Sequence, residues 1–449
     1  MESKTSAYDS PLVTKHSVLG IKHRKFQDEL AAILFLIAIA LFCYIAFWAY
    51  SNWNSVSAFH DSNRNDTEAE KFMQDIKNLP TVLFVIVCAS ILWIQVLNFF
   101  TTAFVYLTLA AGVFVCFWCG YNVANFSNNI TAGISFWVLG VVFIVFIQRK
   151  WASVQVTVKM FAAGAHSLSK AWKGMLYCVF VVIIGTGLHV VYFSFSPMLL
   201  GQRHGVEVKT SNTLYWIVFT FIYFWISSFI TGLLQTTLAD AICVSLYNQE
   251  EAGISSLLRA LYSFGSIALG SLLLNLTSFI RYVVGDTKKE GFSFAKCCFG
   301  CCITQGMRKL SRFLSHYSYI IVAKEGKSFL ISCVTVLDLF KRNTITFQLN
   351  DGFGGFILFL GKSVTSVCAL IYSIRNGHVT AQFSYVAVFI VSWVVNNYFV
   401  RMMTMSIDAT LLLYLEDPQL NIDSELKGFV EGKEVEQDTD LIFDLEFDV

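Results

Sequence analysis

The chain has 449 residues, of which 55% are hydrophobic and 14% are charged, and its formal net charge at pH 7 is +1. Soluble domains carry about 25% charged residues, so this composition, with a mean hydropathy of +0.60, excludes an ordinary water-soluble fold. The small net charge also leaves no basic face that would indicate binding to nucleic acid.

A long uncharged stretch gives the fold class. Between Lys77 and Arg149 the sequence has no Asp, Glu, Lys or Arg. Soluble surfaces need charged groups, whereas lipid accepts such a stretch when the backbone bonds to itself in helices. No alternating β-barrel pattern is present. The sequence therefore predicts an all-α, polytopic membrane bundle.

Apolar runs predict about ten transmembrane helices, some of them discontinuous. In chain order they lie at residues 30–50, 81–100, 103–121, 132–148, 174–196, 213–247, 258–283, 315–340, 353–374 and 382–413. They divide the chain into a cytosolic N-terminal tail (1–29), a transmembrane transporter domain (30–413) and an acidic cytosolic tail (414–449). The first run is too long for a cleaved signal peptide, so we expect it to remain as an anchor.

Basic flanks and glycosylation sequons agree on the orientation. Basic residues precede the first run, so the positive-inside rule places the N-terminus in the cytosol. The loop at 149–173 is basic without any acid and falls on the same side. The external loops then contain three acceptor sequons, which predict a glycoprotein, at Asn65, Asn125 and Asn129. A fourth sequon, at Asn275, lies inside a span and should stay unmodified.

The loop at 281–312 fits this orientation less well. Strict alternation places it outside, whereas its excess of basic residues favours the cytosol. The loop also contains four clustered cysteines, at Cys297, Cys298, Cys301 and Cys302. Palmitoylation, a zinc site, and simple packing or disulfides all remain open for them.

Charges at membrane depth are costly and usually mark a pathway, a relay or a partner. The sequence places seven there, at Asp240, Lys324, Glu325, Lys327, Asp338, Lys362 and Asp408. Lys362 lies roughly 14 Å into its span, and we expect Glu325 or Asp338 to be its ion-pair partner. The stretch 323–328 interrupts an apolar run, which is typical of transporter helices that break at a substrate. His189 could relay protons or bond to a neighbouring helix.

Aromatic residues fill the sixth predicted span. Trp216 and Tyr223 lie on one helical stripe, and Trp225 lies on another that continues through Gly232. An aromatic wall suits a quaternary ammonium ion, which relies on π faces because it cannot donate a strong hydrogen bond. Asp240 is about 22 Å from Trp225 along a straight helix, so both reach one ligand only if the helix breaks near Gly232.

The candidate substrate-binding residues are therefore Trp225, Tyr223, Trp216, Asp240, Glu325 and Lys362, with Trp225 expected to offer the main π face. The sequence contains no nucleophile elbow, no metalloprotease motif and no phosphate-binding loop. We expect no catalytic residue, no metal site, no cofactor and no enzymatic activity. The sequence gives no oligomeric state.

Several short motifs, in order, resemble the choline transporter-like family. Phe264 to Leu272 resembles its Gly-Ser repeat, and Ser318-Tyr319-Ile320 with Gly326-Lys327 resembles its Ala-Tyr-Ile and Gly-Lys block. Leu360-Gly361-Lys362 and Ile407-Asp408-Ala409-Thr410 resemble later motifs of the same family. The chain departs from the family pattern at Ser318 and Ala409.

The resemblance implies a choline transporter in a membrane, with ethanolamine or a related cation as alternative substrates. It also implies transport without a sodium gradient, with proton exchange as an added expectation. The expected partners are the organic cation and membrane lipids, without nucleic acid. The plasma membrane is the expected location, with an endomembrane or organelle as the alternative. A cation channel and a non-transporting scaffold or lipid-handling protein remain alternative functions.

Overall fold

The computed structural model describes residues 24–57, 81–82, 84–93, 95–96, 100–126, 130–149, 151–200, 210–247, 254–286, 316–342, 353–376 and 382–417. Within these ranges the chain forms helices and no strands. The helices are α1 (Glu29–Ser57), α3 (Thr101–Phe126), α4 (Ile130–Arg149), α5 (Trp151–Lys170), α6 (Trp172–Leu200), α7 (Thr210–Leu246), α8 (Ile254–Tyr262), α9 (Phe264–Asp286), α11 (Phe329–Arg342), α13 (Phe353–Arg375) and α14 (Gln382–Glu416). Residues Phe84–Trp93 and 316–325 are also helical.

The all-α membrane fold is confirmed, and each of the ten predicted runs is mostly helical in its described part. Among the described residues, five helices are long and apolar enough to cross a membrane, or six if α8 and α9 form one bent span. The five are α1, α3, α6, α7 and α14. Large apolar side chains such as Leu30 and Phe47 of α1 are about 70% exposed, as expected for a surface that faces lipid.

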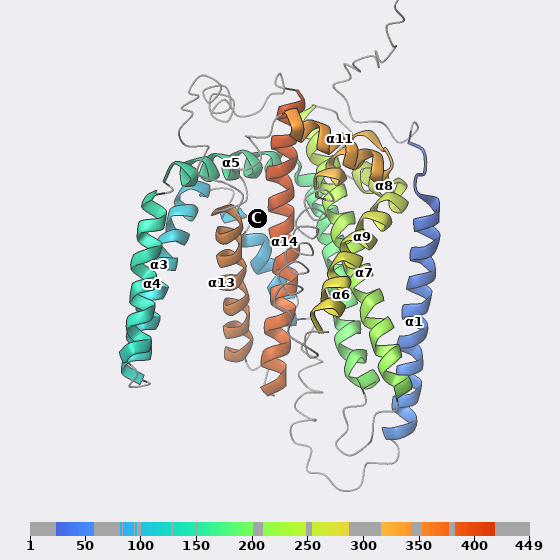
Figure 1. The fold of residues 1–449 in the computed structure, drawn as a ribbon, viewed down its shortest axis with the longest axis horizontal. Helices are drawn as coiled ribbons and strands as arrows, with labels where there is room; N and C mark the ends of the chain where they lie inside the picture. Colours follow the sequence, from blue (N-terminus) through green and yellow to red (C-terminus); the bar gives the residue numbers. More distant parts are fainter. Residues whose placement is uncertain are drawn as a thin grey trace, which may run out of the picture.

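The long helix α7 lies at the centre of the bundle. It packs against α6, α9 and α14, and α1 covers α9 and α7 from the outside. In Figure 1, α14 stands between this group and a second group that contains α3, α4 and α13. Buried side chains of α7 and α14 therefore contribute more to the described core than those of any other helix, because these two helices have neighbours on several sides.

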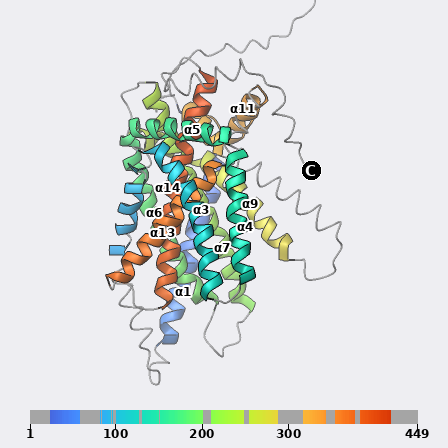
Figure 2. The ribbon, with the colours of Figure 1, turned by 90° about the vertical axis from the view of Figure 1, so that its left-hand side faces the viewer.

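The basic loop predicted at 149–173 is instead largely the helix α5. Figures 1 and 2 both show α5 lying across one end of the bundle, close to perpendicular to the long helices. The backbone carbonyl of Gly164 accepts a 2.5 Å hydrogen bond from Ser406 of α14, and a Cβ at Gly164 would overlap Ile407. The loop prediction was wrong because α5 buries its apolar side chains, such as Val154 and Phe161, against the bundle.

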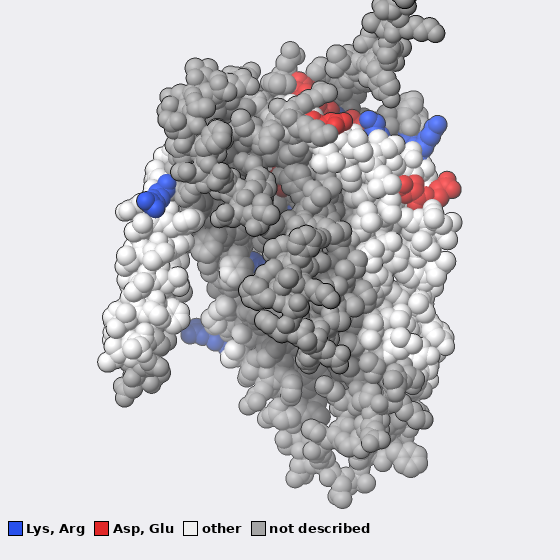
Figure 3. Space-filling view, in the orientation of Figure 1, with Lys and Arg blue, Asp and Glu red and all other residues white. Residues whose placement is uncertain are grey.

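The same end of the molecule carries most of the described charge on the face shown in Figure 3, while the sides of the bundle are nearly uncharged. Two spans are interrupted near this end. The axes of α8 and α9 differ by 69° around Ser263, and helix 316–325 stops before α11 at Gly326, which has φ +65°. The break expected within residues 323–328 is therefore confirmed.

Candidate functional site

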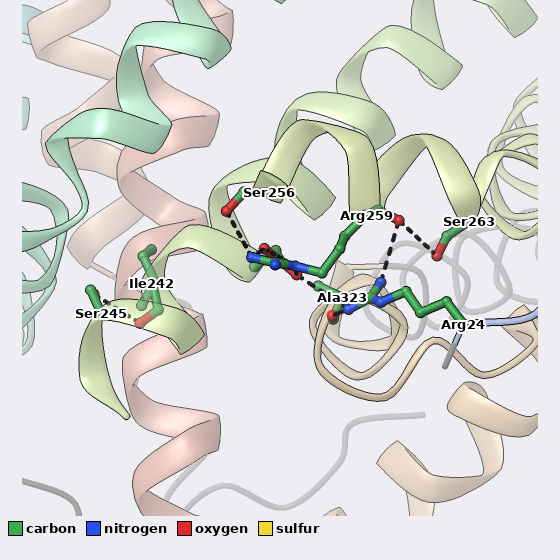
Figure 4. Close-up of polar contacts among 8 residues, drawn as sticks. Arg24, Ile242, Ser245, Ser256, Arg259, Ser263 and Ala323 are labelled. Carbon is green, nitrogen blue, oxygen red and sulfur yellow. Dashed lines mark hydrogen bonds and ion pairs between the residues drawn. The ribbon is translucent and has the colours of Figure 1, made fainter. Parts of the chain in front are cut away.

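Asp240 lies near the end of α7 in a buried cluster with two arginines. Both arginines, Arg24 and Arg259, are labelled in Figure 4. The Arg259 guanidinium donates to both carboxylate oxygens, through Nη2 to Oδ2 at 2.6 Å and through Nε to Oδ1 at 2.8 Å. Arg24 Nη2 donates to Asp240 Oδ1 at 3.2 Å and to the carbonyl of Ala323. Such a two-pronged arginine–carboxylate contact fixes geometry as well as charge.

Arg24 belongs to the segment just before α1, and this segment joins the two interrupted spans. Burial lowers the pKa of the Arg24 guanidinium, while the nearby Asp240 carboxylate opposes that change. Four residues later, Asp28 Oδ2 accepts hydrogen bonds from the Ser266 hydroxyl of α9 at 2.7 Å and from the backbone N–H of Phe329 at 3.1 Å. Residues 24–28 thus bind the start of α9, the end of helix 316–325 and the start of α11.

Gly265 permits this close approach. A Cβ at this position would overlap the Gln27 carbonyl oxygen and would lie 2.5 Å from that of Asp28. The backbone before α1 therefore lies directly on the first turn of α9. Only a glycine leaves room there, so the Gly-Ser pattern at 265–266 positions the segment that contains Arg24.

A second polar cluster lies deeper in the bundle around Asp408 of α14. His316 Nε2 is 2.6 Å from Asp408 Oδ2, and the Tyr317 hydroxyl donates to Oδ1 at 3.1 Å. The other ring nitrogen, His316 Nδ1, lies 2.8 Å from the Gln235 amide of α7. An imidazole between a carboxylate and an amide can gain and release a proton without leaving its position.

A third cluster is aromatic and lies between α6, α7 and α14. The Tyr192 and Tyr223 rings stack with centroids 3.7 Å apart. The His189 ring stands almost perpendicular to Tyr223 at 5.5 Å and to Tyr398 at 5.9 Å. We name these four residues the aromatic cluster. All four are buried.

The two tryptophans proposed for the π face lie in different surroundings from Tyr223. Trp225 is buried, its Nε1 donates to the Ala268 carbonyl at 3.2 Å, and Phe35 of α1 meets its ring at 5.3 Å. Trp216 is half-buried and packs against the core. The Trp225 face is therefore directed toward α1 and α9, away from the aromatic cluster.

The break expected at Gly232 is absent, because α7 continues from Thr210 to Leu246. A Cβ at Gly232 would instead meet Ile267 at 2.9 Å and the Tyr319 ring at 3.1 Å. This glycine permits close helix packing. Asp240 and Trp225 consequently stay at separate heights on one unbroken helix.

The expected ion pair of Lys362 with Glu325 or Asp338 is not found among the described residues. Lys362 Nζ lies 4.1 Å from the centroid of the Trp393 ring of α14. Glu325 pairs with Lys327 instead, with Oε2 and Nζ 2.7 Å apart. The sequence spacing misled here because the break at Gly326 keeps Glu325 near the end of the bundle, where Lys324 also pairs with Glu416 at 2.6 Å.

Other sequence predictions fall outside the described residues, or on residues whose side chains are not described. They are the sequons at Asn65, Asn125 and Asn129, the side of the loop at 281–312 and the role of its four cysteines. Asn275 is described: it is buried, and its amide donates to the Phe221 carbonyl at 3.0 Å. Within the described part of the chain, no His, Cys, Asp and Glu side chains gather in a way that could hold a metal ion.

Several residues of these clusters were not singled out from the sequence, namely Arg24, Arg259, Tyr192, His316 and Tyr398. Arg259 carried a usable signal, since it is a charge within the run at 258–283. The tyrosines and His316 carried none, because their roles depend on neighbours that are distant in sequence.

Comparisons with known proteins agree with these membrane features. A family model described as plasma-membrane choline transporter matches residues 134–419. The chain is 26% identical to a CTL-like protein of Dictyostelium discoideum over 90% of this chain and 86% of that protein. It is 33% identical to choline transporter-like protein 2 of Salmo salar and 29% identical to choline transporter-like protein 1 of Caenorhabditis elegans, over 47% and 50% of this chain. The chain spans about a third of the length of these two animal relatives.

Proposed function

Because the chain belongs to the plasma-membrane choline transporter family, we propose that it carries choline across a membrane, with ethanolamine as a further substrate, and that it needs no sodium gradient. Relatives from animals are named as choline transporter-like proteins. The proposal includes exchange of choline for protons and, for the location, the plasma membrane. It does not include an enzymatic step.

The observation that carries the proposal is the aromatic cluster. The perpendicular His189, Tyr223 and Tyr398 rings form the walls that a trimethylammonium group requires, since π faces replace hydrogen bonds for such a cation. In the described arrangement Tyr192 covers the face of Tyr223. When choline enters, the Tyr192 ring would move away from Tyr223. The cation would then lie against the face of the Tyr223 ring that Tyr192 had covered.

This placement changes the roles within the candidate set. Tyr223 becomes the main π face, because Trp225 is occupied by contacts with α1 and α9. Asp240, Glu325 and Lys362 do not contact the cation in this proposal. Asp240 and Glu325 form ion pairs near the end of the bundle. Trp216 lies on the same stripe of α7 as Tyr223. It packs against the core and so helps to hold that side of α7 in place.

Proton exchange is assigned to the His316–Asp408 pair. This pair joins α14 to helix 316–325 and reaches α7 through Gln235. The helices α7 and α14 also hold Tyr223 and Tyr398 of the aromatic cluster, so a proton on the pair would change the packing that controls access to choline. Tyr317 faces the same carboxylate.

The decisive experiment is uptake of labelled choline into proteoliposomes that contain the purified full-length chain. We expect saturable uptake that persists when sodium is replaced by potassium and that an inside-acid pH gradient accelerates. A lack of saturable uptake would favour a scaffold or lipid-handling role. Single-channel currents carried by choline would identify a channel.

A further inference from the structure

Arg24 holds together the elements that meet at the charged end of the bundle. Its guanidinium donates to the Asp240 carboxylate of α7 and to the Ala323 carbonyl near the end of helix 316–325. A third hydrogen bond, at 3.3 Å, reaches the Arg259 carbonyl of α8. Figure 4 shows the Arg24 side chain extending toward Ala323 and Arg259. One side chain from the segment before α1 therefore joins three other helices.

A second ion pair closes the same end of the bundle. Lys324 Nζ lies 2.6 Å from Glu416 Oε1 at the end of α14 and 5.5 Å from the centroid of the Tyr247 ring, which directly follows α7. Helix 316–325 is therefore held to α7 and α14 at the residue next to the one that Arg24 binds. The Glu416 side chain is 28% exposed, so this pair lies nearer to water than the buried Arg24.

Gly326 provides a point at which helix 316–325 can turn. The Gly326 N–H donates to the Val322 carbonyl at 2.9 Å, and Gly326 itself has φ +65°. A residue with positive φ ends a helix, so helix 316–325 and α11 are not one rigid rod. A Cβ placed at Gly326 would lie 3.2 Å from Cγ of Arg24. The Arg24 side chain therefore lies directly over the break and restrains it.

Charged contacts are suited to closing an end of the bundle reversibly. A buried ion pair adds little net stability, because the attraction between its charges is largely offset by their loss of hydration. Charges that separate beside water recover that hydration, whereas separated apolar side chains gain nothing from water. The end where Arg24 lies carries most of the described charge on the face in Figure 3. An ionic closure there can open at a lower free-energy cost than an apolar one.

We propose that residues 24–28 form a latch, and that this end of the bundle opens when Arg24 leaves Asp240 and helix 316–325. Helix 316–325 then turns at the break that follows it. The start of the same helix carries His316, a member of the pair to which we assign proton exchange. The latch would thus control access to the interior from this end during transport, a role that rests on the proposed function.

Two native cysteines, both 0% exposed, can report where the bundle opens. Cys243 lies on α7 between Asp240 and Tyr247, on the helix face that meets the charged end. Cys178 lies on α6, and its thiol donates to the Leu234 carbonyl at 3.8 Å. Leu234 is six residues before Asp240, about 9 Å deeper along α7. A buried thiol reacts with N-ethylmaleimide only when local opening exposes it.

The experiment labels purified full-length protein with N-ethylmaleimide, and mass spectrometry of its peptides gives the rate at each cysteine. In the wild type, Cys243 should react at least about tenfold faster than Cys178, because only the latch end opens. Arg24→Gln should raise the Cys243 rate by at least about a further tenfold, since it removes a charge that holds the closed state. Arg259 still pairs with Asp240 in this variant, so the carboxylate keeps a partner.

Lys25→Gln, at the exposed neighbouring position, is the matched control and should leave both rates unchanged. A wild-type Cys243 that reacts no faster than Cys178 would overturn the proposal, because the contact would then be a static lock. Equal acceleration at both cysteines in folded Arg24→Gln would also overturn it, since the whole bundle would have loosened.

If Arg24→Gln cannot be purified in folded form, Glu416→Gln takes its place, because it removes only the partly exposed pair with Lys324. It should accelerate labelling of Cys243 and not of Cys178, and a wild-type rate at Cys243 would overturn the proposal. The labelling needs no choline, so it tests the latch separately from transport. A latch that passes this test in a protein without choline uptake would reject the proposed function and keep the latch.

Discussion

Arg24 and Asp240, which are 216 positions apart, meet as a buried ion pair with Nη2 and Oδ1 3.2 Å apart. Arg259 completes the charge cluster from α8. The pair fastens the segment before α1 to the end of α7, at the point where two spans are interrupted. Opening this end of the bundle would therefore require that Arg24 leave a buried carboxylate.

Asp240→Asn should strongly destabilise the protein, because it leaves two buried guanidinium groups without their carboxylate. Removing one partner of a buried ion pair costs about 3–5 kcal/mol. Thermal unfolding of the purified protein in detergent should occur well below the wild-type temperature. Arg24→Gln combined with Asp240→Asn should recover part of the loss. Lys25→Gln, at an exposed neighbouring position, is the control and should change little.

Gly265→Ala should separate the segment before α1 from α9. The added methyl group would overlap the Gln27 carbonyl oxygen, so the backbone must shift, at a cost of about 1–3 kcal/mol. Gly187→Ala is the matched control, since nothing lies within 4 Å of the methyl group that it would add. It should stabilise α6 slightly, because alanine favours helix over glycine. Equal unfolding temperatures for the two variants would contradict the described packing.

Tyr223→Leu should raise the choline concentration needed for half-maximal uptake about five- to thirtyfold. The reason is the loss of one strong cation–π contact of about 1–2 kcal/mol. Trp225→Leu tests the alternative face, and we expect it to lower stability more than choline affinity because Trp225 is packed against Phe35. Uptake kinetics at matched protein content measure both. A kinetic defect confined to Trp225→Leu would return the site to the other face of α7.

Asp408→Asn and His316→Gln should abolish acceleration of choline uptake by an inside-acid gradient. Each removes one member of the pair to which we assign the proposed proton exchange, whereas the aromatic cluster remains. Uptake should therefore persist at the rate measured without a gradient. His166→Gln, at an exposed position of α5, should keep the full response. A full response in both test variants would assign proton exchange to other groups.

Asn275→Gln should leave gel mobility unchanged in cells that glycosylate secretory proteins, because Asn275 is buried in α9 and bonds to Phe221. Asn65→Gln, and at least one of Asn125→Gln and Asn129→Gln, should increase mobility through loss of a glycan. A mobility change only in Asn275→Gln would contradict the predicted orientation of the spans.

The sequence alone determined the fold class and the positions of the apolar helices, although it did not predict the helix α5. A stretch such as 77–149 without internal charge can exist only as helices in lipid, so hydropathy was sufficient. The break near Gly326 was also predictable, since polar residues and a glycine interrupt an apolar run there. The Gly-Ser repeat at Phe264 to Leu272 lies at a close helix contact, since a Cβ at Gly270 would overlap Phe329 and Tyr319.

Tertiary structure alone decided which polar groups meet. Arg24 reaches Asp240 because the segment before α1 crosses the end of α9, and no local pattern records that path. Lys362 meets Trp393 and not Glu325 because the helix break holds Glu325 near the end of the bundle. Helix periodicity places residues on a face, but the choice of the neighbouring helix depends on packing between segments that are distant in sequence. For that reason the stripes of α7 did not show which neighbours each ring has, whereas the structure places Tyr223 against α6 and Trp225 against α1.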